Sequence, residues 1–324
     1  MPGPTVDLAR ETIPPDEQAT TVEFVAFLKA ASAARHPTGE VPRFNQGRHS
    51  GCVEAEFTVV NGLQTDLKVG LFQQPRSYSA WIRFANATSA SDRDKDVRGM
   101  SIKVRGVRGE NLTPGSDEQD FVLNSHPVMM VPGPREFLEL LRAVETGGFK
   151  RALYFLKHPG AARIAFASRQ NPPSHLDISY WSTTPYQFGQ GRAVKYIVRP
   201  VSRAHPRTPA LTDTYLHDEL RFRLSMEEVA FDFFVQFQKS ARTMPIEDAS
   251  VEWSERESPY VRVAEVRIPR QAIDAPGREQ ACERTSFNPW HCLTEHRPLG
   301  GMNRARREIY QAMQQFRDSR FART

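Results

Sequence analysis

The residues best suited to chemistry lie in the stretch RREIYQAMQQFR, residues 306–317. One arginine, Arg306, stands four residues before Tyr310, and another, Arg317, stands seven residues after it. On a helix these offsets return to one face, so two guanidinium groups can flank one phenol. Nearby cations favour the phenolate form of a tyrosine. Because a phenolate is a good ligand for ferric iron, the spacing suggests a metal-binding tyrosine.

A simpler interpretation of the same arginines also stands. Basic side chains near the C-terminus of a helix complement its dipole, and this requires no ligand. The end of the sequence is rich in such residues: Arg304, Arg306, Arg307, Arg317, Arg320 and Arg323. The spacing alone leaves both interpretations open.

Composition excludes several classes of protein. The 324 residues include 20 phenylalanines and carry a net charge of +5, which is typical of a globular chain with a sizeable core. The positive charge suits anionic groups such as carboxylates, but it forms no basic block, so we expect no nucleic-acid partner. No apolar run is long enough to span a membrane.

The N-terminus and the cysteines indicate a cytoplasmic protein. The first twenty residues are polar and lack the basic and then apolar pattern of a signal peptide. The three cysteines, Cys52, Cys282 and Cys292, have no metal-site spacing. We therefore predict reduced, mostly buried thiols.

The elements that must position Tyr310 form a predicted α+β fold with an antiparallel β-barrel core and flanking helices. Alternating apolar residues predict strands at 52–60, 65–72, 78–87, 97–107, 119–131, 191–201, 217–226 and within 250–269. Helical spacing predicts helices at 20–34, 135–148, 151–168 (broken at Pro159) and the C-terminal end. Residues 228–241 fit either type. We expect residues 1–35 to form an arm and a short helix, and 36–324 to form a single domain.

Several segments, taken in order, resemble the haem catalase superfamily, and in particular its small bacterial members, the catalase-related peroxidases. RGMSIKV (98–104) is similar to the family's RGFAVKF strand, and RFANAT (83–88) is similar to its RFST. NSHPVMM (124–130) is similar to NNTPIFF, and Phe137 follows Pro127 by ten residues, where the family has a porphyrin-stacking phenylalanine. With the C-terminal arginine and tyrosine pattern, the resemblance covers about residues 40–320.

The resemblance implies a cofactor and a set of residues that hold it. Tyr310 would be the axial ligand of a ferric haem b, the ligand type that catalases use. Arg306 would hydrogen-bond the phenolate oxygen and keep it deprotonated. The remaining cofactor-binding residues would contact the propionates or the porphyrin: Arg43, Arg83, Arg317 and Phe137.

The catalytic side of the expected site departs from the family pattern. The frame RFNQGRHSGCVEAEF (43–57) places Gln46 where catalases have their histidine. Asn124 matches the asparagine that orients the peroxide. A glutamine amide donates and accepts hydrogen bonds but does not titrate near neutral pH. Rapid hydrogen peroxide disproportionation, which needs a proton shuttle, is therefore expected to be weak.

Two histidines are alternatives for the proton transfer. His49 is three residues beyond Gln46, and a shift of the loop would bring it over the iron. His126 lies two residues after Asn124, on the same face if the strand continues. Either histidine is equally compatible with a structural role. A Cys292 thiolate is a rival iron ligand to Tyr310.

The resulting functional hypothesis is a haem-dependent oxidoreductase that uses hydrogen peroxide or organic hydroperoxides. The expected partner is a small peroxide or hydroperoxide molecule. We expect no membrane span in the chain, and we expect the chain to be a monomer or homodimer. The alternative is a non-catalytic haem-binding protein or pseudoenzyme, or a scaffold that binds no haem.

Overall fold

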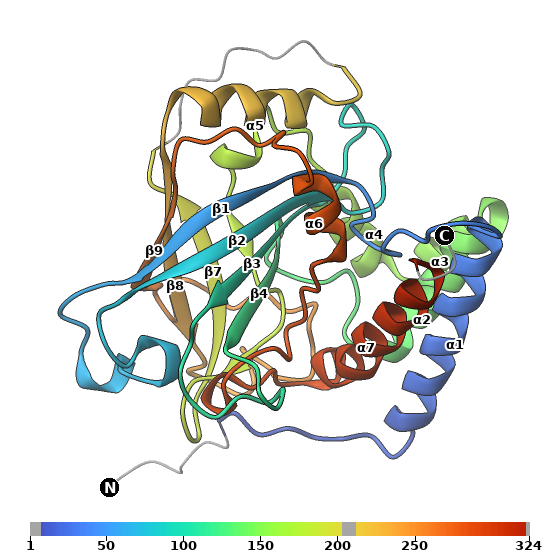
Figure 1. Cartoon of the computed structure of the whole chain (residues 1–324). Helices are drawn as coiled ribbons and strands as arrows, with labels where there is room; N and C mark the ends of the chain where they lie inside the picture. Colours follow the sequence, from blue (N-terminus) through green and yellow to red (C-terminus); the bar gives the residue numbers. More distant parts are fainter. Residues whose placement is uncertain (1–7, 203–211, 322–324) are drawn as a thin grey trace, which may run out of the picture.

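In the part of the chain that the structure describes, nine antiparallel strands form the centre of the protein, and eight of them close into a barrel (Figure 1). The computed structural model describes residues 8–202 and 212–321. Neighbouring strands follow the order β5-β4-β3-β2-β1-β9-β8-β7-β6, and β5 also pairs with β7, which closes the ring and leaves β6 outside it. The strands are β1 His49–Val59, β2 Ser77–Asn86, β3 Arg98–Arg105, β4 Glu118–Asn124, β5 Tyr180–Trp181, β6 Tyr186–Gln187, β7 Ala193–Pro200, β8 Val229–Phe237 and β9 Val261–Ile268.

Among the described residues, seven helices flank the barrel. They are α1 Glu17–Arg35, α2 Pro134–Thr146, α3 Gly148–Lys157, α4 Pro159–Ser168, α5 Tyr215–Met226, α6 Arg278–Arg284 and α7 Gly301–Phe321. Short 3₁₀ turns cover Thr65–Leu67, Gly70–Phe72, His175–Asp177 and Thr294–His296. The predicted α+β barrel with flanking helices is therefore confirmed. No described helix has the length and apolar character needed to cross a bilayer.

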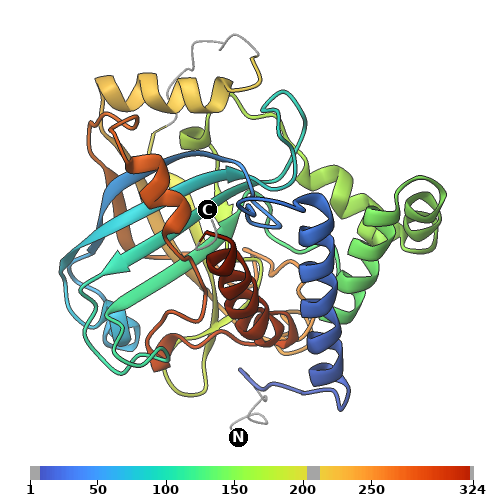
Figure 2. The same cartoon turned by 45° about the vertical axis from the view of Figure 1, so that its right-hand side comes forward.

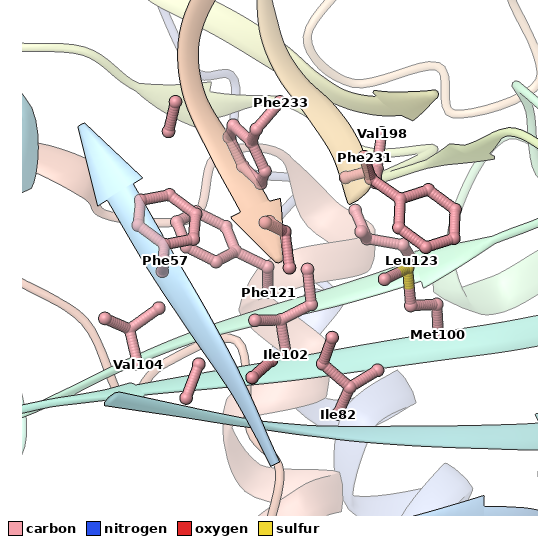
Figure 3. Packing of buried hydrophobic residues seen from close by; sticks show 14 of the residues in the cluster. Phe57, Ile82, Met100, Ile102, Val104, Phe121, Leu123, Val198, Phe231 and Phe233 are labelled. Atoms are coloured by element: carbon pink, nitrogen blue, oxygen red, sulfur yellow. The ribbon is translucent and has the colours of Figure 1, made fainter. Parts of the chain in front are cut away.

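The barrel interior is filled by apolar side chains (Figure 3). Along β1, Val53, Phe57 and Val59 are buried while Glu54 is exposed, as expected when one face of a strand turns inward. Phe233 packs edge-on against Phe121, with 4.7 Å between ring centroids. Because these rings occupy the lumen, functional side chains must lie on the outer wall or between it and the helices.

Helices α1, α2 and α7 pack together on one side of the barrel, as Figures 1 and 2 show. Their contact is apolar and includes Phe24 and Leu28 of α1, Leu138 of α2 and Met313 of α7. The helix that carries Tyr310 is thus held against the barrel by two others. Helix α6 lies over β1, and α5 crosses the end of the barrel nearby (Figure 1).

Some predicted strands are wrong. Residues 217–226 belong to helix α5, in which Leu216, Leu220 and Leu224 recur every four residues and are all fully buried. This helical period was masked by the alternating charges between the leucines. Residues 65–72 form two 3₁₀ turns, because the backbone N–H groups of Leu67 and Phe72 bond three residues back.

Other boundaries also differ from the predictions. Strand β4 ends at Asn124, so 125–131 are irregular, and no strand covers 250–255. The ambiguous segment 228–241 contains strand β8. Helices α3 and α4 divide at Pro159, as predicted.

The prediction of reduced cysteines is wrong for two of the three. Cys52 of β1 and Cys282 of α6 form a disulfide across a sequence separation of 230 residues. Such a distant pairing has no signature in local cysteine spacing. Cys292 is a free, fully buried thiol.

Candidate functional site

Alternation along β2 places a charged side chain on the outer wall of the barrel. Ile82 and Phe84 point into the core, so Arg83 between them points outward. Arg83 is nevertheless only 1% exposed. A guanidinium group is rarely buried this fully unless it is paired, so its surroundings mark a candidate site.

Arg83 belongs to a cluster that also contains the buried Arg317 and the partly buried Arg43, His49 and Glu283, which we call the arginine cluster. The Glu283 carboxylate accepts a hydrogen bond of 2.7 Å from Nη1 of Arg43 and one of 3.2 Å from Nη2 of Arg83. Nε2 of His49 lies 3.4 Å from the same carboxylate. These residues come from both ends of the sequence, so only the folded barrel brings them together.

Arg43 is fixed in this cluster by the backbone. Besides Glu283, it donates to the carbonyl oxygens of Cys282, Glu283 and Thr285, at 3.4, 3.3 and 2.7 Å. These carbonyls belong to the end of α6, which the disulfide ties to β1. The position of Arg43 therefore depends on a segment 240 residues away in the sequence.

The arginine cluster holds more positive than negative charge. Burial, together with Arg43, lowers the pKa of Arg83 to about 9, and burial lowers the pKa of Arg317 to about 10. Burial acts to raise the pKa of Glu283, but Arg43, Arg83 and His49 hold it below its usual value. In the described part of the chain, Glu283 is the one carboxylate that pairs with Arg43 and Arg83.

Several buried nitrogen atoms of the cluster have no hydrogen-bond partner among the described residues. They are Nε of Arg83, Nη1 of Arg317 and Nδ1 of His49. Buried donors are normally satisfied, and an unsatisfied one needs an explanation. Excess positive charge and free donors together suit an anionic group with several oxygen atoms.

Tyr310 lies on α7, half-buried, on the face that also carries Arg306 and Arg317. It interacts electrostatically with Arg43 and with Tyr186, so it lies near the arginine cluster. Helix α7 begins after Gly300, whose φ of +86° and close approach to the Ile246 carbonyl exclude a Cβ. This turn sets the direction of the helix and hence of Tyr310.

Arg306 contacts Thr184 and Met129 outside α7 and Asn303 on α7 itself. Its Nη1 donates to Oγ1 of Thr184 at 3.2 Å and to Oδ1 of Asn303 at 3.3 Å, and its Nη2 lies 3.9 Å from Sδ of Met129. Among the described hydrogen bonds of Arg306, none goes to the phenol oxygen of Tyr310. Arg306 and Tyr310 share a helix face, and that bond stays a prediction.

Gln46 and Asn124 meet on the outer wall of the barrel. Nε2 of Gln46 donates to Oδ1 of Asn124 at 3.0 Å. Gln46 has a positive φ of 55°, and its backbone N–H bonds to the Ala87 carbonyl at 2.8 Å. Gly99 lies opposite Asn124 in the register, and a Cβ there would meet the Gln46 amide nitrogen at 2.4 Å. The glycine thus leaves the space that the glutamine side chain occupies.

Among the described residues, neither His49 nor His126 forms a hydrogen bond with the Gln46 side chain, which bonds to Asn124. His49 points to Glu283, and burial and Arg83 lower its pKa, which favours the neutral imidazole. His126 follows the end of β4, so the strand geometry assumed for it does not apply. Burial lowers the pKa of His126 as well. The structure thus brings Gln46 to Asn124 and places His49 in the arginine cluster.

Phe137, Met129 and Met130 lie at α2 or pack near it, whereas Cys292 lies beside Leu112. Phe137 is partly buried and meets Phe24 of α1 edge-on, with 5.8 Å between centroids. Met129 and Met130 are partly buried against the same apolar cluster. Cys292 is fully enclosed, and burial raises the pKa of its thiol, which disfavours the thiolate that the rival iron site needs.

Within residues 8–202 and 212–321, two groups of side chains have the types found in metal sites. In one, His49 and Glu283 lie near Cys282, but that sulfur is committed to the disulfide. In the other, Glu118 and Asp120 lie near His291. There the Lys103 ammonium lies 2.9 Å from Asp120 and also pairs with Glu118, so a cation already neutralises the carboxylates.

Open surface hollows do not coincide with the site. One is lined by Glu252, Ser254, Glu255 and Arg256, and another lies between the N-terminal arm and α7. Neither is lined by a residue of the arginine cluster or by Tyr310. We therefore define the candidate site by its buried, unsatisfied polar groups.

Sequence reasoning missed Glu283 and the disulfide beside it. Glu283 lies in REQACER, a helix of seven residues to which the sequence assigned no element. An acidic residue one position after a cysteine is the only local signal, and it does not identify a partner. The charge excess of the predicted arginines was the better clue, because buried cations require a counter-charge.

Comparisons with known proteins show the fold. No family model matches the sequence, and no curated protein matches it in sequence. Among solved structures, the chain is similar to a fungal catalase (TM-score 0.69, 14% identity, 88% of this chain and 61% of that one). It is also similar to a bacterial catalase (0.67, 14%, 98% and 63%) and to catalase A from Saccharomyces cerevisiae (0.70, 14%, 98% and 68%).

The chain spans less than two thirds of the fungal and the bacterial catalase. The shared part includes the barrel and extends over nearly the whole of this chain. At 14% identity this likeness establishes architecture and not activity. The chain has the fold of the catalases.

Proposed function

We propose that this protein binds a ferric haem b through Tyr310 and uses it to oxidise a substrate with hydrogen peroxide or an organic hydroperoxide. The observation that carries the proposal is the arginine cluster beside Tyr310. Arg43 and Arg83 share the Glu283 carboxylate, and Arg83 and Arg317 keep unsatisfied N–H groups. The two propionates of a haem would supply the missing negative charge, so these residues fit the cofactor.

In this proposal each residue has a defined task. Arg43, Arg83 and Arg317 hold the propionates, Phe137 packs on the porphyrin, and Tyr310 is the iron ligand. Arg306 lies one turn before Tyr310 and favours its phenolate by its charge. Bound haem supplies an iron centre that exchanges electrons with a peroxide. The proposal includes that the chain belongs with the small bacterial catalase-related peroxidases.

Gln46 sets the kind of peroxide chemistry that we expect. Oδ1 of Asn124 accepts a hydrogen bond from Nε2 of Gln46. This leaves the side-chain oxygen of Gln46, Oε1, as the end of the amide that can accept a hydrogen bond. That oxygen accepts a hydrogen bond from a peroxide O–H, but the amide takes up no proton near neutral pH. Reduction of a hydroperoxide to an alcohol and water takes two electrons and two protons, which a donor substrate can provide. Disproportionation of hydrogen peroxide lacks the catalytic base and is slow.

The second candidate function is a non-catalytic haem-binding protein. The Gln46–Asn124 hydrogen bond favours it, because two amide side chains that carry no proton near neutral pH stand where a catalase needs a proton carrier. Steady-state assays with several hydroperoxides distinguish the two functions. Saturable turnover supports the enzyme, and its absence at full haem loading supports the binding protein.

An absorption spectrum tests the cofactor first. Protein produced with haem precursor should show a Soret band of high-spin ferric haem bound to tyrosinate. Tyr310→Phe should lose the haem or shift the spectrum, while the control Tyr260→Phe, at a tyrosine that packs against Arg199, should not. A colourless protein that takes up no added haemin would refute haem binding. An unchanged Tyr310→Phe spectrum would remove Tyr310 as the ligand.

A further inference from the structure

Helices α3 and α4 expose three large apolar side chains. Phe149 is 79% exposed, Leu156 78% and Phe166 84%. In Figure 1 helix α3 lies at the outer edge of the molecule, and α4 lies between α3 and the barrel. Single exposed apolar residues are ordinary, but three of this size within eighteen residues need a reason.

The three side chains point away from the protein interior. On α3 the buried residue is Tyr154, and Phe149 and Leu156 lie roughly 140° and 200° around the helix from it at 3.6 residues per turn. On α4 the buried residue Ala161 is likewise roughly 140° from Phe166. Tyr154 and Ala161 pack into the same apolar cluster. Both helices therefore turn their exposed apolar faces away from one common core.

The same segment is strongly basic. Residues 147–169 contain Lys150, Arg151, Lys157, Arg163 and Arg169 and no aspartate or glutamate. All five basic residues are exposed. The chain as a whole is nearly balanced, with 43 basic and 38 acidic residues, so this separation of charge is local. We call these five residues with Phe149, Leu156 and Phe166 the basic apolar patch.

None of the five basic side chains forms an ion pair with another described residue. Glu136 and Glu139 of α2 interact with Tyr154, which is on the buried side of α3. Glu145 is paired with Arg35 of α1. The patch therefore keeps its positive charge toward solvent.

We propose that the basic apolar patch docks on the surface of a bilayer that contains anionic lipids. Exposed aromatic and leucine side chains can enter the boundary between headgroups and acyl chains, and flanking lysines and arginines reach the lipid phosphates. Charge complementarity favours this partner over a second copy of the chain, whose identical patch would repel it. The proposal does not depend on haem.

Vesicle co-sedimentation tests the docking. The full chain should pellet with vesicles of phosphatidylcholine mixed with phosphatidylglycerol, about tenfold more tightly than with phosphatidylcholine alone, and less tightly as salt rises. The variant F149S/L156S/F166S should lose this binding. The matched control Phe222→Ser changes a phenylalanine that is 57% exposed on α5 and should bind as the wild type does. Circular dichroism should show equal folding of all three proteins.

A second readout locates the contact. Phe166→Trp places a fluorophore in the patch, and its emission should shift to shorter wavelength only when anionic vesicles are added. Absence of binding to anionic vesicles, equal binding by the triple variant, or no emission shift would each overturn the proposal. A concentration-dependent dimer that the triple variant abolishes would also overturn it, because a second copy would then cover the patch.

Discussion

Replacing Glu283 by glutamine should destabilise the haem-free protein more than the haem-loaded protein. The change keeps the shape of the side chain but removes the carboxylate that contacts Arg43 and Arg83, at 2.7 and 3.2 Å. The Arg83 side chain is 2% exposed and has no other carboxylate in contact among the described residues. Its charge would then remain buried without compensation.

The magnitude follows from the burial of the pair. Removing one partner of a fully buried ion pair costs about 3–5 kcal/mol. The Glu283 side chain is 26% exposed, so water screens part of this effect and we expect a loss of about 2–3 kcal/mol. In the haem-loaded protein the propionates would compensate the arginines, and the loss should fall to about 1 kcal/mol or less.

Urea unfolding followed by circular dichroism measures both values. The four samples are wild type and Glu283→Gln, each with and without haem. Glu279→Gln, on the same helix and without a direct contact to the arginines, is the matched control and should change neither form. An equal loss of unfolding free energy in the two forms would refute the idea that the propionates share the arginines with Glu283.

Three further predictions concern other parts of the molecule. Gln46→His should raise oxygen release from hydrogen peroxide by about 10²–10⁴-fold at equal haem content, and unchanged release on an oxygen electrode would contradict the role given to Gln46. His296 is fully buried and accepts the Leu71 backbone N–H at 3.1 Å; burial lowers its pKa from 6.5 to about 4. The folded state therefore resists protonation of His296, and about 3 kcal/mol of unfolding free energy should be lost as the pH falls from 6.5 to 4. Unfolding measured across this pH range should show a smaller loss of unfolding free energy in His296→Gln than in the wild type. The double variant C52S/C282S opens a loop with a sequence separation of 230 residues and should lower the unfolding free energy by about 3–5 kcal/mol, whereas an unchanged denaturation midpoint would show that the disulfide does not form.

The barrel could be predicted from the sequence because its inner and outer faces differ in polarity. Strand β1 shows this most clearly, with Phe57 and Val59 inside and Glu56 outside. The prediction failed where two periods overlap. In α5, charged residues alternate between the leucines and imitate a strand, although the leucines follow a helical spacing. Only packing against the barrel decides between the two periods.

The candidate site could be predicted in part. The types and spacing of Arg306, Tyr310 and Arg317 indicate one helix face, and the structure places all three on α7. The counter-charge at Glu283 could not be predicted, because its contact with Arg43 spans 240 residues. The same limit applies to the disulfide. Local sequence reports the period of an element but not which distant element will cover it.

The pairing of β1 with β9 has a consequence for synthesis on the ribosome. Glu56 lies opposite Arg267, so the first strand has no neighbour on that side until more than 200 further residues have been translated. At about 5–20 residues per second this takes roughly 10–40 s, during which an open strand edge is available to chaperones and to other nascent chains. Arg43 is made before this interval and Tyr310 after it. Capture of any ligand that needs both residues must therefore wait until helix α7 has been translated.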